Sequence, residues 1–223
     1  MRAAPFVEDQ YYHIFNRGVD KRNIFSDTED LVRFFQSMEL FNSAEPIGSI
    51  FEVQKSGQLG AKHPTDKKAV PVKRLVEFVA YCLNPNHFHF ILRQLAEGGI
   101  SEFMKRLGGG YTNYFNERYK RAGALFQGTF KSKLIDSDQY FLRLATYVNL
   151  NFRVHEWGSD MEKLTKSSWN EYIGESHENF CNKEMILDQF KNHEDYKKFA
   201  LEDLKDIVAR KREDREWQSL LVD

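Results

Sequence analysis

Residues 76–92 read VEFVAYCLNPNHFHFIL, two apolar runs separated by Asn84-Pro85-Asn86. Asparagine and proline favour turns, so the stretch predicts a β-hairpin. Successive side chains of a strand point to opposite faces, which places His87 and His89 on one face and Phe88 on the core side. Two neutral imidazoles on one face form half of a metal site or, more simply, a hydrogen-bonded pair at a strand end. The pair alone fixes neither a metal nor a reaction.

Composition indicates a globular protein. The chain has 223 residues, of which 41% are hydrophobic and 29% charged, enough for one core with an appendage or for two small domains. No apolar run approaches the length of about 18 residues that a membrane span needs, so we expect a cytoplasmic protein that binds no membrane. Cys82 and Cys181 form neither a disulfide framework nor a CxxC motif, and we expect two free thiols.

The net charge of −1 hides an asymmetry along the chain. Residues 101–135 carry seven basic and two acidic side chains, whereas residues 156–223 carry 17 acidic and 11 basic ones. A basic middle suits a nucleic-acid-binding core, because contacts to phosphates dominate such binding. A solvated basic helix face is the alternative interpretation.

Hydrophobic periodicity and turn residues predict further elements around the hairpin. We expect strands at 11–16, 49–54 and 124–135, and a mobile loop at 55–73. We expect a first helix that starts at an N-cap at Ser26-Asp27 and ends at Phe41, and a second over 100–119 that is interrupted at Gly108–Gly110. Two more helices should run from Ser137 to Asn151 and over 184–199, and the chain should fray after Ile207. This order predicts an α+β fold in which helices flank one mainly antiparallel sheet.

The helix after Ser137 carries two residues that could act together with the histidine pair, one as a nucleophile and one as a metal ligand. Tyr147 and Asn151 are four positions apart and so share one helical face. A tyrosine can attack phosphorus and hold the product as a phosphotyrosine ester. An asparagine carbonyl is a hard oxygen ligand that suits Mg²⁺ or Mn²⁺. The simpler interpretation is that Tyr147 packs on the sheet, and both stay open on these grounds.

Four ordered motifs resemble the single-tyrosine HUH transposases, in particular the REP-associated tyrosine transposase branch. They are YHIFNRG at 12–18, NPNHFH at 84–89, ALFQGTFKS at 124–132 and YVNLN at 147–151. The resemblance extends from Tyr11 to Trp157, and SSWNEY at 167–172 echoes the branch's C-terminal continuation. That branch has proline after the position of Asn151, where this chain has Phe152; the change lets the helix run further and removes no reactive group.

The resemblance implies a ferredoxin-like or RRM-like HUH nuclease core over residues 1–157, followed by an acidic, mostly helical C-terminal extension over 158–223. It implies that His87 and His89 bind Mg²⁺ or Mn²⁺, that Asn151 is the third ligand, and that Tyr147 is the nucleophile.

The function expected from this resemblance is that of a metal-dependent single-stranded DNA endonuclease and strand transferase, a transposase that forms a 5′-phosphotyrosine at hairpin-containing DNA. Either a monomer or a homodimer is compatible with it. Candidate DNA contacts are Arg17, Lys105, Arg106, Arg118, Lys131 and Lys133. The alternatives are a non-catalytic single-stranded nucleic-acid-binding module of RRM-like fold and a metal hydrolase without a covalent step.

Several other residues compete for roles in the site. Tyr140 lies two helical turns before Tyr147 and could be mistaken for the nucleophile. His13 could face the site, although strand alternation does not decide this, and His155 is expected to be isolated and exposed. Aromatic residues interleaved with basic ones fit either base stacking or helix packing; they are Tyr111, Tyr114 and Tyr119.

Overall fold

The computed structural model describes residues 5–45, 73–155 and 157–220, with side chains through residue 211. Its described strands form one antiparallel sheet in the order β4-β1-β3-β2-β5. The strands are β1 (Tyr11–Arg17), β2 (Val76–Asn84), β3 (His87–Gln94), β4 (Lys131–Leu134) and β5 (Lys166–Ser167). The predicted hairpin therefore forms the centre of the sheet, as β2 and β3.

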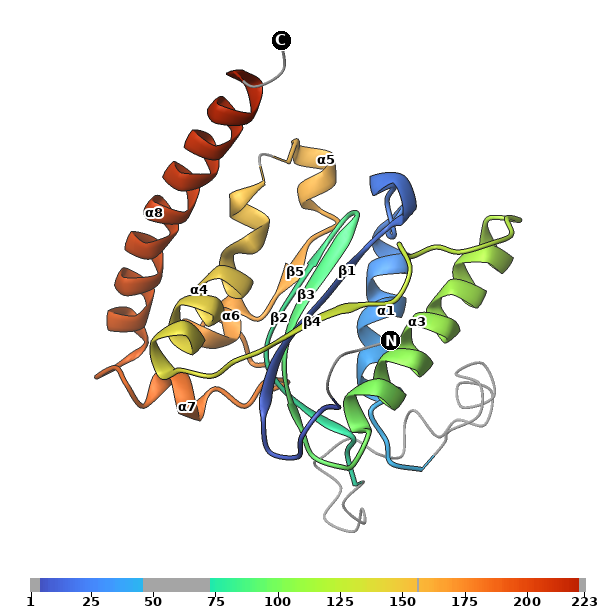
Figure 1. Cartoon of the computed structure of the whole chain (residues 1–223), viewed down its shortest axis with the longest axis horizontal. Helices are drawn as coiled ribbons and strands as arrows, with labels where there is room; N and C mark the ends of the chain where they lie inside the picture. The colour runs from blue at the N-terminus through green and yellow to red at the C-terminus, as the bar shows by residue number, and fades with distance from the viewer. Residues whose placement is uncertain (1–4, 46–72, 156, 221–223) are drawn as a thin grey trace.

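Helices cover both faces of this sheet (Figure 1). They are α1 (Thr28–Leu40), α3 (Gly99–Arg118), α4 (Asp138–Val154), α5 (Ser159–Glu162), α6 (Trp169–Tyr172), α7 (Glu184–Leu187), α8 (His193–Leu220) and the 3₁₀ turn η1 (Val19–Lys21). Helices α1 and α3 lie on one side, and α4 and α8 lie on the other. The predicted α+β fold with a helix-flanked antiparallel sheet is confirmed. In the described part of the chain, every helix is too short or too polar to cross a bilayer.

Alternation along β3 divides its side chains between two cores. Phe88 and Phe90 point toward α1 and α3, where they pack with Phe34 and Phe103. Ile91 points toward α4 and packs in a second core with residues of α4, α6 and α8. His87 and His89 share the face of Ile91, so the histidine pair lies on the α4 side of the sheet, opposite the aromatic core.

Two helix starts follow the predicted capping residues. The Asp27 side chain accepts from the Asp30 amide at the start of α1, and Ser137 accepts from the Tyr140 amide at the start of α4. These oxygens satisfy amides that have no partner within the helix. Helix α4 continues to Val154, three residues past Asn151, as the phenylalanine at position 152 allows.

The structure differs from the predicted elements in three places, one of which is the glycine run. Helix α3 is continuous through Gly108–Gly110, and a Cβ on Gly110 would lie 2.7 Å from the Phe41 ring. Glycine there allows close packing against that ring, and the buried face of α3 offsets its low helix propensity.

The other two differences concern element boundaries. The strand expected at 124–135 shortens to β4, preceded by a single bridge from Phe126 to Gly18. The helix expected at 184–199 is divided into α7 and α8, and α8 continues to Leu220 instead of fraying after Ile207. The expected strand at 49–54, and the expected loop at 55–73 except Lys73, lie outside the described residues.

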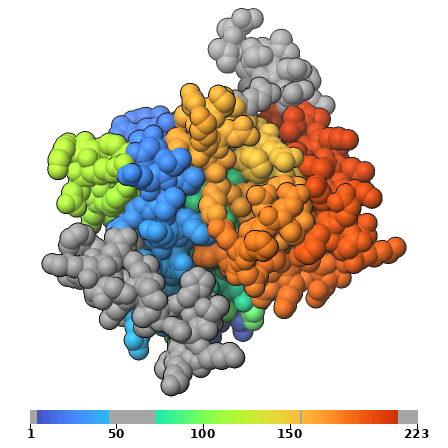
Figure 2. All heavy atoms as spheres, turned by 180° about the vertical axis from the view of Figure 1, so that it is seen from behind, coloured from blue at the N-terminus to red at the C-terminus, as the bar shows by residue number. Residues whose placement is uncertain are grey.

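The C-terminal segment is built into the same sheet and core. Strand β5 pairs with β2, and Trp169, Tyr172 and Tyr196 are buried against the sheet. Seen from behind, the orange atoms of this segment lie between the blue N-terminal residues and the red α8 (Figure 2).

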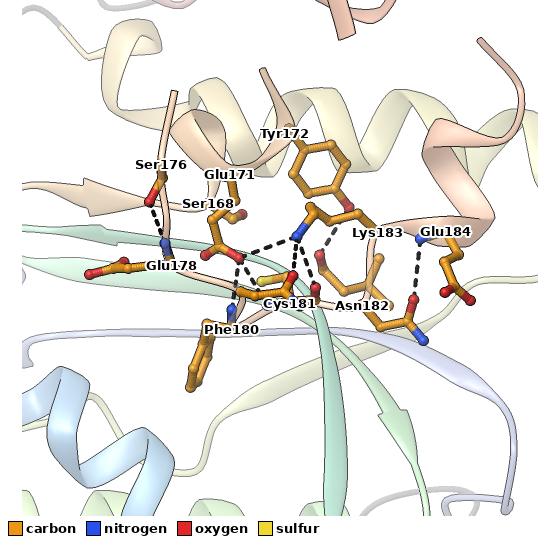
Figure 3. Close-up of polar contacts among 12 residues, drawn as sticks. Ser168, Glu171, Tyr172, Ser176, Glu178, Phe180, Cys181, Asn182, Lys183 and Glu184 are labelled. Atoms are coloured by element: carbon orange, nitrogen blue, oxygen red, sulfur yellow. Dashed lines mark hydrogen bonds and ion pairs between the residues drawn. The ribbon is translucent and has the colours of Figure 1, made fainter. Parts of the chain in front are cut away.

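Glu171 anchors the segment 173–183, which follows α6 (Figure 3). Its Oε2 atom accepts from the amides of Phe180 and Cys181, at 2.9 and 3.0 Å, and lies 3.7 Å from Lys183 Nζ. Burial raises the pKa of this carboxyl, and the two amides and the lysine oppose that rise. This segment is therefore held by the buried carboxyl group of Glu171. Loss of that group would leave the two buried amides without hydrogen-bond partners, which is costly.

Candidate active site

Sheet register brings polar residues from three strands onto the face covered by α4. His87 on β3 is paired with Asn84 on β2 and with Arg17 on β1. One step along, His89 is paired with Cys82 and Phe15. Paired residues of antiparallel strands share a face. The two histidines therefore lie within a polar and aromatic row near the end of the sheet.

Helix α4 supplies the second half of the site. The Asn151 Oδ1 atom lies 3.0 Å from His87 Nε2 and accepts from Asn84 Nδ2 at 2.9 Å. One turn earlier, the Tyr147 ring meets the His89 ring edge to face, with 5.5 Å between ring centroids. The structure thus brings together all four residues that the sequence analysis placed at a metal and nucleophile site.

The protonation of His87 follows from its neighbours. Its Nδ1 atom lies 2.6 Å from the side-chain oxygen Oδ1 of Asn86, which can only accept, so Nδ1 carries the proton of the neutral ring. Its Nε2 atom is then an acceptor, and it receives the Asn84 amide at 3.1 Å. His87 Nε2 and Asn151 Oδ1 are therefore two electron-pair donors that lie side by side.

This donor pair fits a divalent cation. Two ligands at right angles, each about 2.1 Å from an octahedral Mg²⁺, are about 3.0 Å apart, and His87 Nε2 and Asn151 Oδ1 have that separation. The described residues contain no group of three or more His, Cys, Asp or Glu side chains able to hold a metal. A metal at this site would therefore depend on the amide oxygen of Asn151.

Burial keeps the site residues neutral. It lowers the pKa of His87 and lowers that of His89 well below its usual range, the latter further depressed by the neighbouring histidines. Neutral imidazoles can bind metal without first losing a proton. Burial also raises the pKa of the Tyr147 phenol, which the Asn151 side chain opposes. The phenol is therefore protonated at neutral pH and must lose its proton when it reacts.

Residues without a predicted role lie around these four. His13 Nε2 lies 2.9 Å from His89 Nδ1. The His155 ring lies 4.7 Å from that of His87 and stacks on Trp157, so the expectation of an isolated, exposed His155 is wrong. Lys211 of α8 donates to the Val154 carbonyl, at 3.1 Å. The alignment of β1 with β3 could have revealed His13, but no local pattern links residues 155 or 211 to the hairpin.

A family model and a solved structure match this chain. Residues 68–151 match the family of IS200-like transposases. That segment includes His87, His89, Tyr147 and Asn151. A solved structure of a REP-associated tyrosine transposase bound to a REP hairpin is also similar: its TM-score is 0.50 at 12% identity, over 82% of this chain and 93% of that chain. No curated protein matches significantly. The resemblance to these transposases that the motifs indicated is confirmed.

The basic residues expected at the DNA interface of an IS200-like transposase have different surroundings. A groove of about 1390 Å³ runs between α3 and β4, lined in part by Lys105, Lys131 and Lys133. Arg118 lies within 3.0 Å of Asp27, Glu29 and Asp30 and ties α3 to the start of α1.

Other basic and aromatic residues that were candidates for DNA contacts also form hydrogen bonds within the protein. Arg106 bonds Glu102 and the Ser43 carbonyl, and Arg17 donates to Gln127. Tyr111 is buried in the aromatic core and donates to the Ile24 carbonyl, so this ring serves packing rather than base stacking. The three lysines that line the groove are therefore better placed for phosphate contacts than Arg106 and Arg118.

Proposed function

We propose that this protein is a metal-dependent single-stranded DNA endonuclease and strand transferase that forms a covalent 5′-phosphotyrosine. The observation that carries the proposal is the meeting of His87 Nε2 with Asn151 Oδ1, 3.0 Å apart, beside the Tyr147 and His89 rings. The matches to transposases support it, because the segment they share includes both halves of the site.

In this proposal His87, His89 and Asn151 hold Mg²⁺ or Mn²⁺. A bound divalent cation polarises the scissile phosphate and stabilises its developing charge. The Tyr147 oxygen forms a bond to phosphorus and gives up its proton, and the bond from phosphorus to the 3′ oxygen breaks. The 3′ oxygen leaves as a hydroxyl, and the 5′ phosphate stays on the enzyme. Attack by another 3′ hydroxyl reverses the step and joins strands without ATP.

The proposed substrate is single-stranded DNA that carries a hairpin. The similar solved transposase is bound to a REP hairpin, and Lys105, Lys131 and Lys133 lie along a groove that suits a phosphate backbone. Arg17 stands opposite His87 in the sheet and is a fourth candidate contact. We propose residues 1–157 as the nuclease domain, with residues 158–223 as an extension that completes its core, and action as a monomer or homodimer.

Covalent trapping on a denaturing gel tests this function. Wild-type protein with Mg²⁺ and labelled single-stranded hairpin DNA should form a covalent adduct, because a phosphotyrosine ester survives denaturation. Tyr147→Phe keeps the ring and its packing but lacks the attacking oxygen, and should bind DNA without trapping it. Tyr140→Phe is the matched control: the Tyr140 ring lies under Lys133 instead of beside His89, so this variant should trap DNA.

Two results would contradict the proposal. Trapping by Tyr147→Phe would assign the nucleophile elsewhere. DNA binding by the wild-type protein with no adduct in either Mg²⁺ or Mn²⁺ would favour a non-catalytic binding module.

A further inference from the structure

A third histidine, His13 on β1, contacts the proposed metal site through the ring of His89. Its Nε2 atom lies 2.9 Å from His89 Nδ1, and the two ring planes are 18° apart. Phe15 stacks against both imidazole rings, with 4.8 Å between its centroid and that of His13 and 5.7 Å to that of His89. Both histidines are buried, at 8% and 9% exposure. This contact is therefore a fixed part of the structure rather than a surface encounter.

The hydrogen bond requires one of the two nitrogens to carry a proton. A neutral imidazole has one donor nitrogen and one acceptor nitrogen. If His89 donates through Nδ1, its Nε2 atom keeps a lone pair that can bind a metal. If His13 donates instead, the proton of His89 sits on Nε2 and blocks coordination there. The direction of this single bond thus decides whether His89 can be a ligand.

For the other proposed histidine ligand, His87, the neighbouring side chain already decides which ring nitrogen carries the proton. His87 donates from Nδ1 to the side-chain oxygen Oδ1 of Asn86, at 2.6 Å, which leaves Nε2 for the site. Metal-binding histidines commonly donate their second ring nitrogen to a fixed acceptor, which sets the tautomer and the ring orientation. Asn86 provides this acceptor for one histidine, and a ring nitrogen on the neighbouring strand lies at the same position for the other.

We infer that His13 is a positioning residue of the metal site: its Nε2 atom accepts the Nδ1–H of His89 and so reserves the His89 Nε2 lone pair for the cation. Sheet register makes this possible, because Phe15 pairs with His89 and His13 with Ile91, which places the two histidines diagonally on one face. The inference rests on the proposed function for the identity of the ligands.

The tautomer can be measured directly in the wild-type protein. Long-range ¹H–¹⁵N spectra of histidine-labelled protein without metal, near pH 7.5, should show the proton of His89 on Nδ1 and an unprotonated Nε2 on His13. The opposite pattern, with the His89 proton on Nε2, would overturn the inference. This measurement needs neither catalysis nor a variant that folds.

Metal binding supplies the second test, by calorimetric titration with Mn²⁺. His13→Phe keeps a ring but removes the acceptor, and should weaken Mn²⁺ binding about tenfold, as is typical when the acceptor behind a histidine ligand is lost. His13→Gln restores an acceptor oxygen without the ring, and should stay within about threefold of wild type. His193→Phe is the control, because that histidine contacts the Tyr172 carbonyl away from the site.

The outcomes separate the inference from the function beneath it. Wild-type Mn²⁺ affinity in His13→Phe with weakened binding in His13→Gln would show a packing role and overturn the inference, even if DNA trapping through Tyr147 is intact. Weakened binding in His13→Phe, rescued by glutamine, would support it even if no DNA is trapped and the proposed reaction fails. No Mn²⁺ binding by folded wild-type protein would overturn both.

Discussion

At the scale of single residues, Asn84 shows how the site keeps its shape. Its amide nitrogen donates to Asn151 Oδ1 and lies 3.1 Å from His87 Nε2, and its oxygen accepts from Trp157 Nε1 at 3.4 Å. Two acceptor atoms 3.0 Å apart would repel each other without a donor between them. The amide of Asn84 thus holds His87 Nε2 and Asn151 Oδ1 close together. We expect both atoms to be in position before a cation binds.

Among the proposed ligands, Asn151 is the one whose contribution to metal binding is easiest to titrate. We predict that Asn151→Ala raises the Mg²⁺ concentration needed for half-maximal DNA trapping by about 10-fold or more, because one oxygen ligand is lost. Asn151→Asp replaces an amide oxygen with a carboxylate oxygen and should retain activity. The measurement is adduct yield against metal concentration for the three proteins. An alanine variant with the wild-type titration curve would show that the third ligand lies elsewhere.

The buried histidines predict a pH dependence of stability. Burial, reinforced by Lys133, lowers the pKa of His13 to about 4, below the value near 6.5 in the unfolded chain. The unfolded state therefore binds more protons as pH falls, so this contribution to stability is present above pH 6.5 and is lost on acidification toward pH 4. His13 alone should reduce the free energy of unfolding by about 2 kcal/mol between pH 7 and pH 5.

Urea unfolding at the two pH values tests this effect. His13→Phe has no titrating ring at this position, so its stability should change less with pH than that of the wild type. Equal dependence in His13→Phe and the wild type would show that folding does not lower the pKa of His13.

Residues whose positions depend on sequence spacing alone could be predicted, whereas their neighbours in space could not. The i, i+2 spacing of His87 and His89 and the i, i+4 spacing of Tyr147 and Asn151 fix which side chains share a face. The sequence cannot show that Asn84 bridges the two pairs, or that His155 reaches His87. Such contacts depend on sheet register and on how α4 crosses the sheet.

At the scale of elements, the position of α4 depends on the C-terminal segment. Asn149 lies between Tyr147 and Asn151 in sequence but is directed away from the site, where its amide donates to the Tyr196 hydroxyl at 2.8 Å. Its oxygen accepts from Ser168, which also receives the Tyr81 amide of β2. One buried side chain therefore connects α4, which carries Tyr147 and Asn151, to the sheet and to α8.

We predict that Asn149→Ala destabilises the protein by about 1–3 kcal/mol, because it leaves buried polar groups without partners. The loss should also reduce DNA trapping, since α4 carries both Tyr147 and Asn151. Urea unfolding and trapping measure the two effects. Asn170→Ala, at an exposed position of α6, should change stability by no more than about 0.5 kcal/mol. Equal stability of the Asn149 variant and the wild type would show that α4 does not depend on this connection.

Elements with strong local signals could be predicted, and those fixed by tertiary packing could not. Helices α1 and α4 begin at capping residues, and β2 and β3 are apolar runs around a turn. Strand β5 has only two residues and no apolar pattern, so only its pairing with β2 makes it a strand. The three consecutive glycines inside α3, Gly108–Gly110, are poor helix formers, and packing overrides that preference.

At the scale of the whole molecule, a net charge of −1 gives little long-range attraction to DNA. Binding must then come from the local groups along the groove between α3 and β4. Lys131 and Lys133 lie two positions apart on β4 and pair with Phe15 and His13, so all four share the sheet face that α4 covers. The groove reaches this face past the edge strand β4, because His13 and Phe15 line it together with residues of α3. A backbone that follows β4 would meet these lysines on its way to Tyr147.

We predict that single-stranded DNA binding weakens steeply with salt and that Lys131→Ala/Lys133→Ala makes this dependence shallower. If both lysines contact phosphates, the slope of log K against log salt should change by about 1.4, at about 0.7 per single-strand phosphate. Lys163→Ala/Lys197→Ala removes the same charge from residues paired with Asp160 and Glu175, and should leave the slope unchanged. Equal slopes in all three proteins, or a preference for blunt duplex, would contradict the proposed groove.

The 64 residues that separate His87 from Asn151 also set the order in which a newly made chain acquires its parts. At ribosomal rates of about 5–20 residues per second, the histidine hairpin is synthesised roughly 3–13 s before the end of the helix that carries Tyr147. The anchor of that helix, Tyr196, follows later still. We therefore expect a chain still on the ribosome to be unable to cut DNA until its last third has been made and has folded onto the sheet.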